Sequence, residues 1–180
     1  MAQKKRPMSV PDTIVVKRDL ELAGRRHELG VRRALFALLP LLSLLALLNL
    51  FGQRPSRSNA TAAQASLAVY APSRVRGGLL YEARFRVTAR AELKKAVLVL
   101  DSGWLENITV NSIEPQPVSE SSADGRLALD LGEIPSGKSY LLFVYFQVNP
   151  TNVGHRSANV TLYDGSQKLL EASRTITIFP

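Results

Sequence analysis

The sequence contains no cysteine, only two histidines and a single tryptophan. Without cysteine the chain forms no disulfide, holds no metal through thiolates and carries no lipid on a cysteine. A small animal cell-surface domain usually contains a disulfide. The absence of one, together with frequent Arg, Ala and Leu, favours a bacterial origin.

The scarcity of histidine limits metal binding and catalysis. His27 lies in the N-terminal segment, and His155 follows a glycine with no second histidine or carboxylate at ligand spacing. No G-x-S-x-G nucleophile motif occurs. Acids distant in sequence, such as Asp101 or Glu114, could still converge as in an envelope hydrolase, and the sequence leaves this open. We expect a protein that is not an enzyme and that uses no metal or cofactor.

Charge is absent from one block, residues 34–53. Its first eighteen residues are mostly leucine, and twenty helical residues span about 30 Å, the thickness of a bilayer's hydrocarbon core. A buried core helix would show a polar face, and a cleaved signal peptide would have a shorter apolar stretch with a nearby cleavage site. We therefore predict a transmembrane helix over residues 34–53 that acts as an uncleaved signal anchor.

Flanking charge predicts the orientation of this helix. Six Lys or Arg lie within twenty residues before the block, and two lie in the matching window after it. Basic residues favour the cytoplasmic side, so we expect a single-pass plasma membrane protein with a cytoplasmic N-terminus. The tail, residues 1–33, has a net charge of +5 and is expected to lie against anionic lipid, docking on a partner protein being the alternative. The predicted membrane-interface residues are Arg25, Arg26, Arg32 and Arg33.

The rest of the chain reads as a polar linker, residues 54–65, followed by an exported β domain, residues 66–180. Between Tyr81 and Thr88 apolar and charged residues alternate, which is typical of a half-buried strand. Residues 95–100 form a short apolar run that predicts a central strand, and Asp164-Gly165 predicts a hairpin turn. One final strand is expected to carry Leu170, Ala172, Ile176 and Ile178 and to stop at the last residue, Pro180.

These short strands, seven or eight in number with turn signals between them, predict the fold class. We expect an all-β, antiparallel, immunoglobulin-like sandwich preceded by the single transmembrane helix. The cysteine pair and the tyrosine corner of true immunoglobulin domains are missing, so the prediction concerns the architecture alone.

Residues 132–139 match the G-x-x-x-x-G-K-S pattern of a phosphate-binding loop. Such a loop needs a helix after it, whereas residues 140–148 (YLLFVYFQV) read as a strand. We therefore expect a hairpin connection here and no nucleotide binding.

Two loops are candidates for contact with a partner. Trp104, beside the turn at residues 101–103, is either core filler or an exposed anchor for a protein or a sugar. Asn149 and Asn152 lie in a loop, residues 147–154, that is rich in hydrogen-bonding groups. All three could equally be structural.

Four segments carry a resemblance to a known family: residues 49–55 (NLFGQRP), 70–73 (YAPS), 113–117 (IEPQP) and 147–154 (QVNPTNVG). With these segments the chain resembles a family of actinobacterial single-pass membrane proteins with an exported immunoglobulin-like domain, for which no activity is established. Residues 129–140 also resemble the strand-turn-strand of bacterial surface β-sandwich repeats. The family resemblance implies the same topology and compartment, and a YetF-type membrane protein as a partner.

The sequence thus favours a membrane-anchored, non-enzymatic module that binds a membrane or envelope partner outside the cytoplasm. The partners we expect are membrane lipid and an envelope protein, and not nucleic acid. The alternative is a module that binds a cell-envelope polysaccharide, which predicts that Trp104 and neighbouring tyrosines lie exposed in a row.

Overall fold

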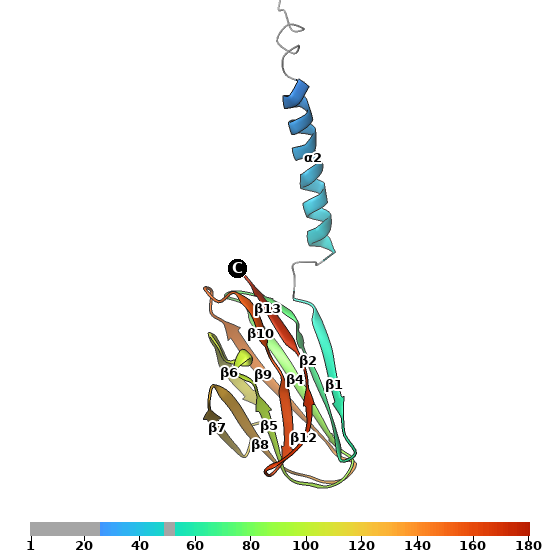
Figure 1. Cartoon of the computed structure of the whole chain (residues 1–180), viewed down its shortest axis with the longest axis vertical. Coiled ribbons are helices and arrows are strands. Elements are labelled where there is room, and N and C mark those ends of the chain that lie inside the picture. Colours follow the sequence, from blue (N-terminus) through green and yellow to red (C-terminus); the bar gives the residue numbers. More distant parts are fainter. Residues whose placement is uncertain (1–25, 49–52) are drawn as a thin grey trace, which may run out of the picture. The chain divides into compact units, whose positions relative to one another are not determined.

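The computed structural model describes residues 26–48 and 53–180. The chain divides into two compact units, Met1–Leu48 and Asn49–Pro180. The first unit contains a helix and the second is built from β-strands (Figure 1). Most of the predicted tail, including Arg25, lies outside the described residues.

The helix α2 spans Arg26–Leu47 and contains Pro40. The helix begins before residue 34, the start of the predicted block, because helical backbone hydrogen bonding extends through Arg32 and Arg33. It ends at Leu47, before residue 53, the end of the predicted block. Its portion Glu28–Leu47 has 20 residues and a mean hydropathy of 1.7, sufficient in length and composition to cross a membrane. The guanidinium of Arg32 lies 5.6 Å from the ring centre of Phe36. The large apolar side chains along α2 are exposed.

The second unit contains three sheets, which we name A, B and C. Sheet A has the strand order β1 (Pro55–Thr61), β2 (Ala65–Pro72), β4 (Leu80–Ala89), β9 (Ser139–Val148) and β6 (Ile108–Glu114). Sheet C has the order β12 (Gln167–Ala172), β11 (Val160–Asp164), β5 (Leu93–Leu100), β8 (Arg126–Ile134) and β7 (Ser119–Ala123). The small sheet B has the order β10 (Gly154–Ser157), β13 (Thr175–Phe179) and β3 (Arg74–Arg76).

Sheets A and C are antiparallel throughout and enclose one apolar core, so the predicted antiparallel sandwich is confirmed. The predicted alternation holds in β4, where Tyr81, Ala83, Phe85 and Val87 are buried. Strand β5 lies at the centre of sheet C, as its apolar run predicts. The number of strands is higher than expected, because the described residues also form short strands and a separate sheet B.

The prediction of a linker over residues 54–65 is wrong. Strand β1 occupies most of this segment and pairs with β2 from Pro55↔Pro72 to Thr61↔Ser66, which makes it an edge strand of sheet A (Figure 1). Its side chains alternate between exposed and half-buried positions. A strand that packs only small residues inward, here Ser56, Ser58 and Ala60, has no large apolar face, so its sequence looks like a linker.

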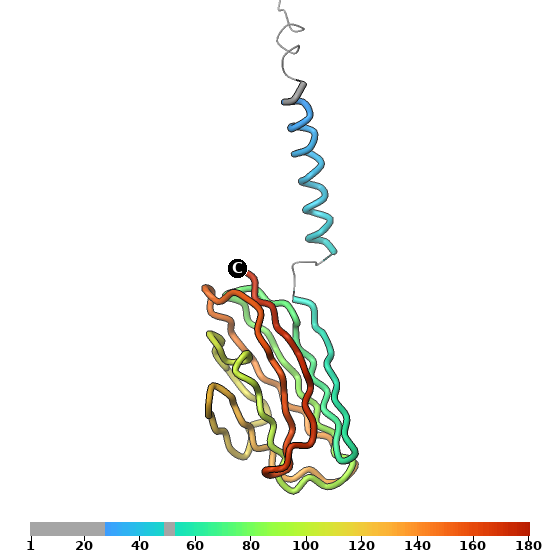
Figure 2. The backbone as a smooth tube through the Cα atoms, in the orientation of Figure 1, coloured from blue at the N-terminus to red at the C-terminus, as the bar shows by residue number. Residues whose placement is uncertain are grey.

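The predicted final strand is two strands. The chain leaves sheet C after Ala172 and enters sheet B at Thr175, and the backbone path in Figure 2 continues from one sheet to the other without reversing. The hairpin predicted at Asp164-Gly165 joins β11 to β12, with Gly165 at a positive φ of 57°. The G-x-x-x-x-G-K-S segment connects β8 to β9 and is followed by a strand, as expected.

Trp104 is the centre of the core. It ends the short 3-10 helix η1 (Ser102–Trp104), is fully buried, and lies 5.4 Å from the rings of both Phe85 and Phe146. Its indole N–H donates to the carbonyl of Ala158 at 2.9 Å. Gly103 permits this position, because a Cβ there would lie 2.0 Å from the carbonyl oxygen of Ser157.

Arg174, between β12 and β13, places a cation against this core. Its guanidinium lies 5.8 Å from the Trp104 ring centre and donates to Ser56 in β1 and to the carbonyl of Ala71 in β2. The residue is 7% exposed and has no acidic partner among the described residues. Burial lowers the pKa of the guanidinium, and the nearby Tyr81 phenol opposes this shift. Arg174 therefore ties the first hairpin of sheet A to the centre of the sandwich.

Replacement of Arg174 tests this connection. Arg174→Ala removes the hydrogen bonds to Ser56 and to the Ala71 carbonyl and is expected to lower the free energy of unfolding by about 2–4 kcal/mol. Arg74→Ala, which removes an exposed arginine, should change it by less than about 0.5 kcal/mol. Urea denaturation of the full chain in detergent, followed by the fluorescence of Trp104, measures both. Equal stability of the two variants would show that Arg174 does not hold the hairpin.

Candidate binding surface

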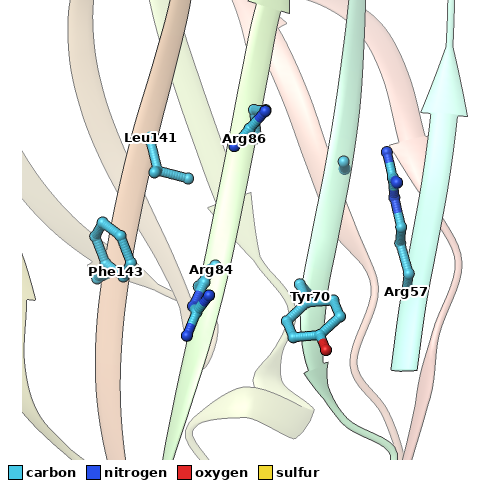
Figure 3. A pocket seen from close by; sticks show the side chains of 7 residues that line it. Arg57, Tyr70, Arg84, Arg86, Leu141 and Phe143 are labelled. Carbon is cyan, nitrogen blue, oxygen red and sulfur yellow. The ribbon is translucent and has the colours of Figure 1, made fainter. Parts of the chain in front are cut away.

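The outward face of sheet A carries a row of alternating cations and rings. Strand register places Arg57 opposite Tyr70, Tyr70 opposite Arg84, and Arg84 opposite Phe143. We call these four residues, which come from β1, β2, β4 and β9 and cross the sheet at right angles to its strands, the arginine–aromatic row (Figure 3). Opposing side chains on one face of a sheet lie about 5 Å apart at Cβ, so the row is continuous.

Arg84 is the most highly connected member of the row. Its guanidinium lies 5.8 Å from the ring centres of both Tyr70 and Phe143, and it forms an ion pair with Glu82 on the same strand. Arginine stacks on aromatic faces while still offering N–H groups at its edge. The ion pair with Glu82 thus holds the Arg84 guanidinium between the rings of Tyr70 and Phe143, which remain partly exposed to solvent.

The electrostatics of Glu82 follow from this contact. The hydrogen bond from Arg84 holds the pKa of the Glu82 carboxyl below its usual range. The hydrogen bond between the Tyr145 hydroxyl and Glu82 raises the pKa of that phenol. Glu82 is therefore ionised, and Tyr145 neutral, at neutral pH.

The arginine–aromatic row borders a hollow of about 340 Å³. The hollow forms because β2 presents only the small side chain of Ala68 between the long side chains of β1 and β4. Figure 3 shows Arg57 on one side of it and Arg84 and Arg86 on the other. Its full lining is Arg57, Ala68, Tyr70, Arg84, Arg86, Leu141 and Phe143.

Two further hollows adjoin the first along β2. One, of about 210 Å³, shares Tyr70 and Arg84 with it, and the other, of about 260 Å³, shares Arg57 and Arg86 and extends to Arg90. Together the three form a trough that we call the sheet A trough. Four arginines and one glutamate line it, so its charge is positive.

Three of these arginines have no acidic partner among the described residues. Arg57 donates to Asn59 at 2.8 Å, and Arg84 is paired with Glu82. Within the described part of the chain the guanidinium groups of Arg86 and Arg90 have neither a carboxylate nor a hydrogen-bond acceptor. The side chain of Arg86 reaches the central hollow, and that of Arg90 reaches the adjoining one.

The predicted contact residues lie elsewhere. Trp104 and Asn152 are buried, so the prediction that they contact a partner is wrong, and so is the prediction of an exposed row that includes Trp104. The Asn152 amide donates to the carbonyls of Glu106 and Asn107 and accepts from Arg156. These hydrogen bonds connect its loop to the segment at residues 106–107. Asn149 is exposed and accepts from Thr151, and its contact role stays a prediction.

The two acids singled out in the sequence, Asp101 and Glu114, have different neighbours. Asp101 lies 3.5 Å from Arg126, and Glu114 extends from β6 opposite Phe143. His155 contacts Thr177 at 2.9 Å. In residues 26–48 and 53–180 no three His, Asp or Glu side chains gather in a way that could hold a metal ion.

The alternation in β4 predicts outward arginines, but it does not predict that they lie beside Tyr70 and Phe143, which depends on strand pairing. One signal was present. The segment YLLFVYFQV places aromatic residues on both faces of β9, although only Phe146 and its neighbours at every second position face the core. Rings on the solvent face of a strand indicate a contact surface.

Comparison with known proteins gives no family. No protein-family model matches the chain, and no curated protein matches it. Similar solved structures include a CARDB domain from Pyrococcus furiosus, which is 12% identical over 71% of this chain and 96% of that chain, with a TM-score of 0.37. A non-cellulosomal cohesin from Archaeoglobus fulgidus is 15% identical over 61% and 88%, with a TM-score of 0.39. The C-terminal domain of wzt is 12% identical over 72% and 81%, with a TM-score of 0.42. No ligand or activity follows for this chain from likenesses at this level.

The electrostatic link within the row is testable by titration. Arg84→Gln should move the pKa of Glu82 up towards the ordinary value of about 4.3, because the favourable hydrogen bond and charge are lost. Because the pKa of Glu82 is lower in the folded than in the unfolded chain, its ionised carboxyl stabilises the fold at a pH above the unfolded-state pKa. This stabilisation is lost as the pH falls through the folded-state pKa. Carboxyl ¹³C NMR of the full chain in detergent measures the shift, with Glu82→Gln to assign the signal. An unchanged Glu82 titration in Arg84→Gln would refute the pairing, and Arg74→Gln serves as the control.

Proposed function

We propose that this chain is a membrane-anchored, non-enzymatic binding module whose β-sandwich presents the sheet A trough to a partner in the cell envelope. The observation that carries the proposal is the arginine–aromatic row. A folded domain that only spaced or capped the chain would have no use for half-exposed rings held between guanidinium groups, with the unpaired Arg86 and Arg90 beside them.

The anchor is helix α2. Its portion Glu28–Leu47 is long and apolar enough to span the hydrocarbon core of a bilayer. Arg26 begins the helix, Arg32 and Arg33 lie in its first turns, and Arg25 precedes it in the sequence. Each basic residue near an anionic leaflet contributes about 1 kcal/mol. The excess of basic residues before the helix supports a cytoplasmic N-terminus and an exported sandwich in the plasma membrane.

The partner belongs to the membrane or the envelope, because the anchor confines the sandwich to that space. A YetF-type membrane protein, implied by the resemblance of the sequence, is one candidate. The positive charge of the trough favours a partner surface that carries carboxylate or phosphate groups.

Topology is tested with reporter fusions. Alkaline phosphatase fused after Pro180 should be active, since it is active only outside the cytoplasm, and a cytoplasm-dependent fluorescent reporter at the same place should be dark. The full-length chain should stay in the membrane fraction after a carbonate wash and keep its N-terminal tag. A reporter active only in the cytoplasm, or a chain released without detergent, would overturn the anchor.

The binding face is tested by site-specific photocrosslinking in intact cells. A photoreactive residue in place of Leu141, which lines the central hollow, should form crosslinked products with an envelope component. The same residue in place of Glu120, an exposed position on β7 in sheet C, serves as the control and should give at least about tenfold less product if the trough is the binding face. Equal yields at the two positions would count against sheet A as the binding surface.

A further inference from the structure

The sheet A trough has features that select among anionic partners. Three successive rows of residues cross sheet A, each defined by strand register. The first is the arginine–aromatic row. The second contains Asn59, Ala68, Arg86 and Leu141, and the third, which we call the hydroxyl row, contains Thr61, Ser66, Thr88 and Ser139.

The rows offer three kinds of contact side by side. Side chains two residues apart on a strand lie about 7 Å from each other, so the unpaired cation of Arg86 lies at that spacing from Arg84, whose charge is balanced by Glu82. Tyr70, 42% exposed, presents a flat apolar surface beside them. Thr88 and Ser139, whose hydroxyls lie 2.8 Å apart, present groups that both donate and accept hydrogen bonds.

We propose that the sheet A trough binds an acidic polysaccharide, a sugar polymer that carries carboxylate or phosphate groups along its length. This inference rests on the proposed function and names the ligand class of the same surface. The guanidinium groups of Arg57, Arg86 and Arg90 pair with the anionic groups, the rings of Tyr70 and Phe143 stack against sugar faces, and the hydroxyl row exchanges hydrogen bonds with sugar hydroxyls.

The shape of the trough agrees with a polymer. Its three hollows follow β2, whose eight residues extend about 27 Å at 3.4 Å per residue. The trough is therefore longer than a single sugar and open at its side. Within it only Glu82 is acidic, and Arg84 neutralises that charge. Glu114, opposite Phe143 on β6, limits the positive region at the far end of the row.

An acidic peptide fits this surface less well. A peptide gains most of its affinity for a sheet by adding a strand at an edge. Strands β2, β4 and β9 are interior strands whose backbone groups are already paired on both sides, and a peptide added to the edge strand β1 would lie beside the trough and not in it. A peptide on this face would leave its own backbone groups without partners, whereas a sugar polymer has its polar groups on its rings.

The test uses the full chain in phosphatidylcholine nanodiscs and immobilised polygalacturonate as the probe. Methyl-esterified polygalacturonate keeps the sugar backbone but removes its charge. The basic N-terminal tail is unchanged in every variant, so only differences between variants report on the trough. Trp104 fluorescence verifies that each variant is folded.

Four variants separate the contributions. The double variant Arg57→Gln/Arg86→Gln should bind polygalacturonate about tenfold more weakly, since an exposed ion pair contributes up to about fivefold. Tyr70→Ala, which leaves the charge unchanged, should weaken binding several-fold. Glu82→Gln should strengthen binding, because Arg84 is released. Arg74→Gln on sheet B, the matched control, should have little effect, and the methyl ester should bind at least tenfold more weakly.

Four outcomes would overturn the inference. If all variants behave like Arg74→Gln, the trough is not the site. If poly-glutamate competes as well as polygalacturonate and Tyr70→Ala has no effect, the surface recognises acidic peptide or charge alone. If polygalacturonate binding falls as the phosphatidylglycerol content of the nanodiscs rises and is finally lost, the trough binds anionic lipid headgroups. Crosslinking from Leu141 to an envelope protein without polygalacturonate binding would refute the ligand class and leave the proposed function standing.

Discussion

The buried contact between Arg174 and Trp104 is the constraint on which the rest of the sandwich depends. Trp104 fills the centre of the core between Phe85 and Phe146. Arg174 lies over the Trp104 ring and donates hydrogen bonds to Ser56 and Ala71. The first hairpin is therefore held to the centre of the core by these side-chain hydrogen bonds as well as by backbone pairing with β4. A buried cation without an acidic partner is costly. Its retention is understandable because its guanidinium satisfies polar groups of β1 and β2 that water does not reach.

That hairpin supplies half of the candidate binding surface. Arg57 lies one residue after Ser56, and Tyr70 lies one residue before Ala71, so the inward contacts of Arg174 fix the outward positions of both. Side chains alternate between the two faces of a strand, and a slip of one residue would turn Arg57 and Tyr70 into the core. The same register that completes the core therefore aligns the arginine–aromatic row, and stability of the interior and geometry of the exterior are coupled.

Much of this architecture could be predicted from the sequence, and the failures have physical causes. The apolar run before residue 48 predicts a helix, the alternation in β4 predicts a half-buried strand, and the dense aromatic and β-branched residues of β9 predict a strand. Strand β1 is not predicted because an edge strand with small inward residues has no apolar signal. The break between β12 and β13 at Arg174 is not predicted because Ala172 and Ile176 lie an even number of residues apart, so the alternation of apolar residues continues across it. Trp104 beside a turn gave no sign of burial, which depends on Gly103 allowing close contact with β10. The binding row needs the pairing of strands distant in sequence, which alternation alone does not specify.

Chemical labelling of arginine in native membranes tests the central claim, that the sheet A trough is covered by a partner in the cell. Phenylglyoxal modifies accessible guanidinium groups, and mass spectrometry reports the extent at each residue with and without prior detergent extraction and purification. The account predicts that Arg57, Arg86 and Arg90 are protected in intact envelopes and become reactive in the purified chain, while exposed Arg74 reacts equally in both. Equal reactivity of the trough arginines in the two states would contradict it.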